Sequence, residues 1–122
     1  MEFNQYNTTV QQWIHTVLEN RETNADVVLE CCRDIIAYER KTDDPKLMGF
    51  GFFYGGEIYY ELNDGAHFFH MMTEALTYLD RAEEWELVVR CYNFLGIASM
   101  SRGNPSLALD YYMNGLKDSD TY

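Results

Sequence analysis

An ungapped internal repeat of forty residues constrains this chain more than any other feature. Residues 31–38 match residues 71–78 in size and polarity, although few of the pairs are identical. The same shift aligns further residues without a gap: Leu47 with Leu87, Phe52 with Tyr92, and Gly56 with Gly96. A fixed period of this length is typical of helical solenoids, in which each pair of helices stacks on the next.

Clusters of turn-forming residues divide the chain into segments long enough for helices. Within these segments apolar residues recur three and four positions apart, and Asp44-Pro45 and Asn104-Pro105 resemble an N-cap followed by a first-turn proline. The aromatic stretch 50–60 lacks the alternation of a strand. The sequence therefore predicts an all-α fold of about six helices, at residues 8–20, 24–41, 44–62, 65–80, 83–102 and 105–118.

Length and composition limit the class of protein. The chain has 122 residues, which suits one domain, and 47% hydrophobic residues, which is enough to form a core. A net charge of −11 argues against a nucleic-acid partner, because phosphate binding needs clustered cations. The longest uncharged apolar stretch, residues 48–56, is far shorter than the roughly 20 residues of a spanning helix. We expect a cytoplasmic protein that does not insert into membranes and has three reduced, helix-borne cysteines.

The repeated residues resemble the tetratricopeptide repeat (TPR) family. The residues that carry the likeness are Tyr92, Leu95-Gly96, Gly103-Asn104, Ala108, Tyr112 and Gly115-Leu116 in one unit, and Phe52, Gly56, Tyr59, Asn63-Asp64 and Ala75-Leu76 in the other. The resemblance implies a TPR-like solenoid over about residues 24–118, with repeats at 44–80 and 83–118 and a degenerate N-terminal pair at 8–41. The chain departs from the family pattern at Gly55, Phe68 and Ser99, and its period exceeds the usual ~34 residues.

Packing and binding roles follow from that resemblance. Gly56 and Gly96 are expected to allow two antiparallel helices to approach closely, with tyrosines filling the space between them. Ligands of the family contact the concave face, which by position comprises Phe53, Glu57, Tyr60, Arg90, Asn93, Ile97 and Met100. An alternative is that Phe53 and Tyr60 pack against the helix at 8–20. The cations of the subtype that clamps a terminal carboxylate are missing from the first unit.

Three sequence patterns that bind ligands or catalyse reactions in other proteins are better explained in this chain by helix structure. Residues 55–59 resemble the nucleotide-binding loop of diguanylate cyclases, but Gly56 coincides with the packing glycine of the repeat. His67 and His70 share a helix face without an identifiable third metal ligand. No serine or cysteine has a base nearby in a pattern typical of a nucleophile. We predict a non-enzyme that has no catalytic residue, cofactor or metal.

A second, weaker resemblance suggests a biological setting. Residues 17–24, 85–96 and 103–112 are similar to the N-terminal repeat regions of some bacterial GGDEF-type diguanylate cyclases. That likeness implies a cytosolic regulatory region that binds a protein or peptide and adjusts cyclic-di-GMP synthesis. Two alternatives remain open: a free-standing TPR adaptor, and the peptide-sensing region of a quorum-sensing regulator. Residues 1–23 are too short for the DNA-binding helices that such regulators usually carry.

The helix predicted at 105–118 has more apolar residues than one buried stripe requires. Solenoids usually end in a helix with a polar outer face. We therefore expect a fragment of a longer protein, in which Leu109, Tyr112, Met113 or Leu116 is partly exposed. Two copies are expected to form a weak homodimer through this helix.

Overall fold

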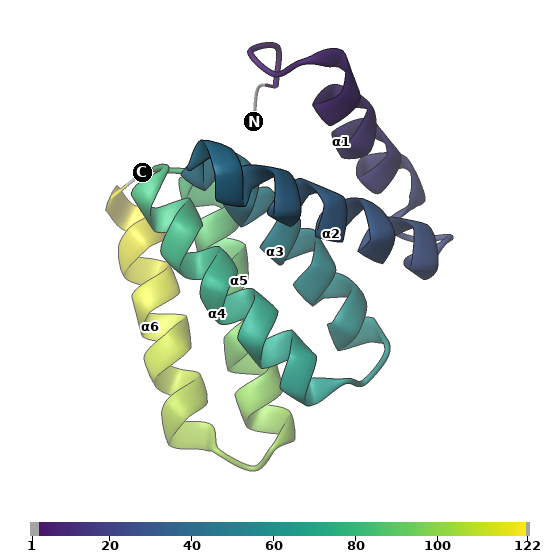
Figure 1. The fold of residues 1–122 in the computed structure, drawn as a ribbon. Coiled ribbons are helices and arrows are strands. Elements are labelled where there is room, and N and C mark those ends of the chain that lie inside the picture. The colour runs from purple at the N-terminus through teal and green to yellow at the C-terminus, as the bar shows by residue number, and fades with distance from the viewer. Residues whose placement is uncertain (1–2, 122) are drawn as a thin grey trace.

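A computed structural model describes residues 3–121, with side chains as far as residue 117, and this part of the chain is all-α (Figure 1). The helices are α1 (Thr8–Asn20), α2 (Ala25–Thr42), α3 (Pro45–Glu61), α4 (Gly65–Arg81), α5 (Trp85–Ser101) and α6 (Pro105–Thr121). The predicted all-α class is confirmed. Each boundary lies within three residues of its predicted position, and the largest difference is the longer C-terminal end of α6.

The forty-residue period consists of two halves of twenty residues, because the last three turns share one geometry. Asn63, Glu83 and Gly103 have positive φ angles of 58°, 58° and 75°. In each turn the N–H of the following residue donates to a carbonyl five positions earlier, at 2.9–3.0 Å. This is the Schellman motif, which ends a helix with one left-handed residue. The next helix begins two residues after the left-handed residue, so α4, α5 and α6 start at intervals of twenty residues.

Helix α3 is the centre of the fold, and every residue from 47 to 58 is buried. Its glycines allow neighbouring helices to approach: a Cβ added at Gly51 would lie 3.0 Å from Ile36 of α2, and one at Gly56 would lie 3.1 Å from Met72 of α4. In α5, a Cβ at Gly96 would lie 2.7 Å from the Tyr112 ring of α6. The predicted close approaches at Gly56 and Gly96 are therefore confirmed.

The helices form two antiparallel hairpins, α3–α4 and α5–α6, with α2 beside α3 and α1 at the N-terminal end (Figure 1). Aromatic rings join α3 to α5, since Phe94 lies 6.1 Å from Phe53 and 5.3 Å from Tyr60 between ring centroids. At the other end, Trp13 of α1 contacts Tyr38 of α2. The two hairpins pack on each other through α4 and α5, and α6 packs against α5.

The outer face of α6 carries exposed apolar side chains, as the sequence predicts. Leu109, Met113 and Leu116 are 60%, 58% and 60% exposed, whereas Tyr112 is half-buried against Gly96. Among the described residues, no helix has both the length and the hydropathy needed to cross a membrane.

Candidate functional site

The seven residues predicted for the concave face come from α3 and α5, but their exposure differs. Asn93, Ile97 and Met100 are open to solvent, while Tyr60 and Arg90 are half-buried. Phe53 and Glu57 are buried. A partner lying on this surface would not reach the last two, so their expected role as partner contacts is corrected to a structural one.

Glu57 is the centre of a buried ion cluster that joins three elements. Its carboxylate accepts two hydrogen bonds from Arg21 at the end of α1, at 2.9 and 2.7 Å, and one from Arg90 of α5 at 3.2 Å. Arg21 lies over the Tyr54 ring at 5.0 Å, and Arg90 lies over the Phe53 ring at 4.8 Å. Burial alone would lower the pKa of Arg21, but the hydrogen bond and charge of Glu57 raise it overall.

The cluster therefore fixes the surface on which a partner would lie. Arg90 is held toward α3, and its remaining exposed edge adjoins the open side chains of α5. Asn93, Ile97 and Met100 follow one another at spacings of four and three residues, which places them on one helix face. We call these three residues the α5 stripe.

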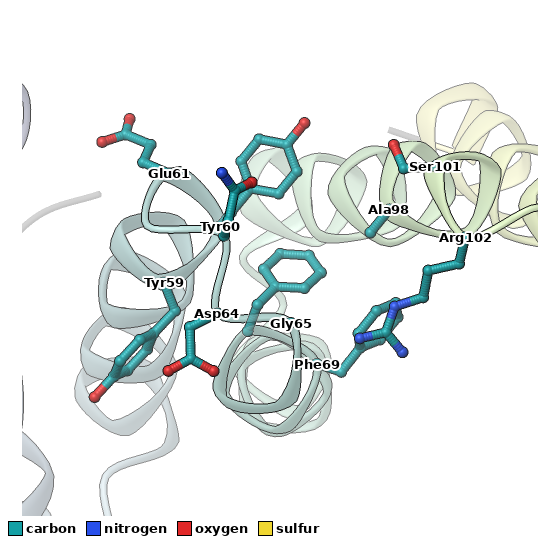
Figure 2. A pocket seen from close by; sticks show the side chains of 11 residues that line it. Tyr59, Tyr60, Glu61, Asp64, Gly65, Phe69, Ala98, Ser101 and Arg102 are labelled. Carbon is teal, nitrogen blue, oxygen red and sulfur yellow. The ribbon is translucent and has the colours of Figure 1, made fainter.

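A pocket of about 340 Å³ lies between the α3–α4 turn and the end of α5 (Figure 2). The rings of Tyr60 and Phe68, 5.4 Å apart between centroids, form part of its wall. Glu61 and Asp64 line one side, and Arg102 lines the other with its guanidinium 4.3 Å from the centre of the Phe69 ring.

The pocket adjoins the α5 stripe, because its lining residue Ser101 lies one helical turn after Ile97 on the same face of α5. Its aromatic wall and its two kinds of charge suit a side chain of a bound polypeptide. Of the predicted residues only Tyr60 lines it. The other lining residues could not be recognised in the sequence, because they meet only when the start of α4 and the end of α5 are brought together.

The patterns that resemble chemical motifs have structural roles in the described part of the chain. Gly55 and Gly56 lie inside helix α3, whereas the diguanylate cyclase motif they resemble is a hairpin loop. His67 Nδ1 is 2.8 Å from Asp64, and His70 contacts the edge of the Phe52 ring. No three His, Cys, Asp or Glu side chains among the described residues are placed to hold a metal ion.

The cysteines are free thiols, and their surroundings lower their reactivity. Burial raises the pKa of Cys91 to about 12 and raises that of Cys32 as well, which keeps both thiols protonated at neutral pH. Cys31 is half-buried, and burial with the nearby charges of Asp34 and Glu30 raises its pKa too.

No known protein family, curated protein or solved structure matches this chain. Its function is therefore inferred from three features of the molecule itself: the buried Glu57 cluster, the α5 stripe and the pocket beside it.

Proposed function

We propose that this chain is a helical-repeat module of the TPR type that binds a polypeptide along the α5 stripe and into the adjoining pocket. The observation that carries the proposal is an exposed apolar surface beside a cavity. Ile97 and Met100 are 43% and 54% exposed, and the pocket next to them is walled by aromatic rings. Exposed apolar surface of this kind, rimmed by polar groups, is typical of a protein interaction site.

Two further features support a binding role. The Glu57 cluster holds α1, α3 and α5 together, so the surface is formed before a partner arrives and little ordering would be needed on binding. Asn93 is exposed within the stripe, where its side-chain amide can hydrogen-bond the backbone of an extended peptide.

A role in signalling is proposed from the sequence resemblance to GGDEF-type diguanylate cyclases alone. In that extension the module is the regulatory region of a GGDEF diguanylate cyclase, and its partner alters how the catalytic domains pair. A free-standing adaptor and a peptide sensor use the same surface. Sequencing the gene beyond these 122 residues would show whether a GGDEF domain follows, and this separates the regulatory region from the adaptor and the peptide sensor.

Selection from a displayed peptide library tests the binding role directly. We expect peptides to be enriched on the intact chain and to lose about tenfold or more in affinity for Ile97→Asp, because a charge would replace an apolar contact. Asn93→Ala is expected to cost about 1 kcal/mol, the scale of one hydrogen bond. Leu18→Asp on α1, which is also exposed, is the matched control.

Equal binding of the selected peptides to the intact chain and to Ile97→Asp would refute the assignment to the α5 stripe. Failure to enrich any peptide, with the protein shown to be folded by circular dichroism, would count against the binding role itself.

A further inference from the structure

A second cavity, of about 310 Å³, lies between α2 and α4 and reaches α3. The residues that give it its chemical character are Arg33 and Arg40 from α2, Phe52 and Tyr59 from α3, and His67 and His70 from α4. None of its lining residues belongs to the α5 stripe, and Tyr59 alone is shared with the pocket beside that stripe.

The charge of this cavity is opposite to that of the protein. The chain has 20 Asp and Glu against 9 Lys and Arg, yet two arginines and two of the three histidines line this one cavity and no carboxylate does. All four side chains are exposed to solvent, so a ligand can reach them. Concentrated, carboxylate-free positive charge thus suggests that an anion completes the site.

The two guanidiniums keep most of their donors open. Arg33 makes one hydrogen bond, from Nε to the Leu29 carbonyl at 3.3 Å. Neither it nor Arg40 forms an ion pair with any described residue. Each guanidinium has five N–H donors, so several remain available to a ligand. Asp64, which does not line the cavity, is bound to His67 Nδ1 at 2.8 Å.

The geometry suits an anion held between the two arginines. Arg33 and Arg40 are seven residues apart on one face of α2, which is about 10.5 Å along the helix. Both side chains line the same cavity from α2, and His70 lines it from α4, so all three can contact one ligand. Guanidiniums bind phosphate through paired hydrogen bonds, and two of them match its double charge.

The inner part of the cavity is aromatic. Phe52 is buried, and its ring is stacked on Tyr78 at 5.8 Å. The Tyr59 ring stacks on His67 at 4.8 Å, which holds both side chains in place. A ligand whose phosphate lies at the arginines would therefore place its body against fixed rings.

We propose that this cavity binds a small organic phosphate with an aromatic or apolar body, at a site separate from the polypeptide surface. Arg33 and Arg40 bind the phosphate, His70 adds a polar contact, and Phe52 and Tyr59 contact the body. A small molecule bound at this site would act on the module without occupying the α5 stripe.

Calorimetric titration of the full chain with phenyl phosphate tests the proposal. We expect saturable binding, with weaker binding of inorganic phosphate and none of phenol. The double variant Arg33→Gln with Arg40→Gln is expected to lose at least about tenfold in affinity. The matched control, Lys41→Gln with Arg81→Gln, removes two exposed cations outside the cavity and should bind as the intact chain does.

Three results would overturn the proposal: no binding of phenyl phosphate to the folded chain, equal losses in both double variants, or equal affinity for phenol. Binding of a phosphotyrosine peptide without binding of phenyl phosphate would overturn the small-molecule assignment. Melting curves of both variants establish that each is folded, and neither touches the α5 stripe, so peptide binding there remains an independent measurement.

Discussion

Removing the Glu57 carboxylate tests whether the buried ion cluster holds the helices together. The carboxylate is buried and accepts three hydrogen bonds from two guanidiniums. Glu57→Ala would leave Arg21 and Arg90 without an anion, and breaking a fully buried pair in this way costs about 3–5 kcal/mol. The two arginine side chains are 28% and 34% exposed, so water can partly replace the lost partner. We therefore expect a loss near the lower end, about 3 kcal/mol.

That loss is large compared with the total stability of a domain, about 5–15 kcal/mol. It corresponds to a fall in melting temperature of roughly 10 °C for a chain of this size. Urea denaturation followed by far-UV circular dichroism measures it. Glu61→Ala is the matched control. Glu61 lies one turn further along the same helix, is exposed and forms no ion pair with the described residues. Its replacement should change the free energy of unfolding by no more than about 0.5 kcal/mol.

A double-mutant cycle with Arg21→Ala separates the ion pair from the lost side-chain volume. We expect a coupling energy above about 1 kcal/mol that persists in about 1 M NaCl, because a buried pair is weakly screened. A coupling energy near zero, or a loss for Glu57→Ala no larger than that of the control, would refute the view that this cluster fixes α1, α3 and α5.

Three other perturbations have defined outcomes. Gly96→Leu should cost about 1–3 kcal/mol because the new side chain meets the Tyr112 ring, and an unchanged melting temperature would contradict this register of α5 on α6. Burial, assisted by the charges of Asp43 and Asp44, raises the pKa of Glu39, so its ionisation opposes folding above the ordinary glutamate pKa. Glu39→Gln should therefore be more stable than the parent at pH 7, with a difference that shrinks as the pH falls toward about 4; a gain independent of pH would exclude this explanation. Sedimentation at increasing concentration should reveal weak self-association that increases with salt and is lost in Met113→Glu; a strict monomer in high salt would rule out association through α6.

The positions where the helices begin and end could be predicted from the sequence. Helix boundaries depend on local groups: Asp44, Asp64 and Asn104 cap the residues directly after them, and Gly103 adopts the left-handed conformation that ends α5. The packing glycines were also readable, since Gly56 and Gly96 recur at the same place in a repeat. Such signals act within a few residues, so a sequence shows them directly.

Which side chains meet and which stay exposed could not be predicted from the sequence, because this depends on how the helices pack. The repeat pattern places Phe53 and Glu57 on the concave face. In the structure, however, the Glu57 carboxylate binds Arg21, which lies thirty-six residues earlier in the chain, and it becomes the centre of a buried ion cluster. The cavity lined by Arg33, Arg40 and His70 likewise joins two helices that are not consecutive in the chain. These contacts depend on how far each helix is rotated and shifted against its neighbours. That arrangement is set by the packing of whole helix faces, and no local pattern of residues specifies it.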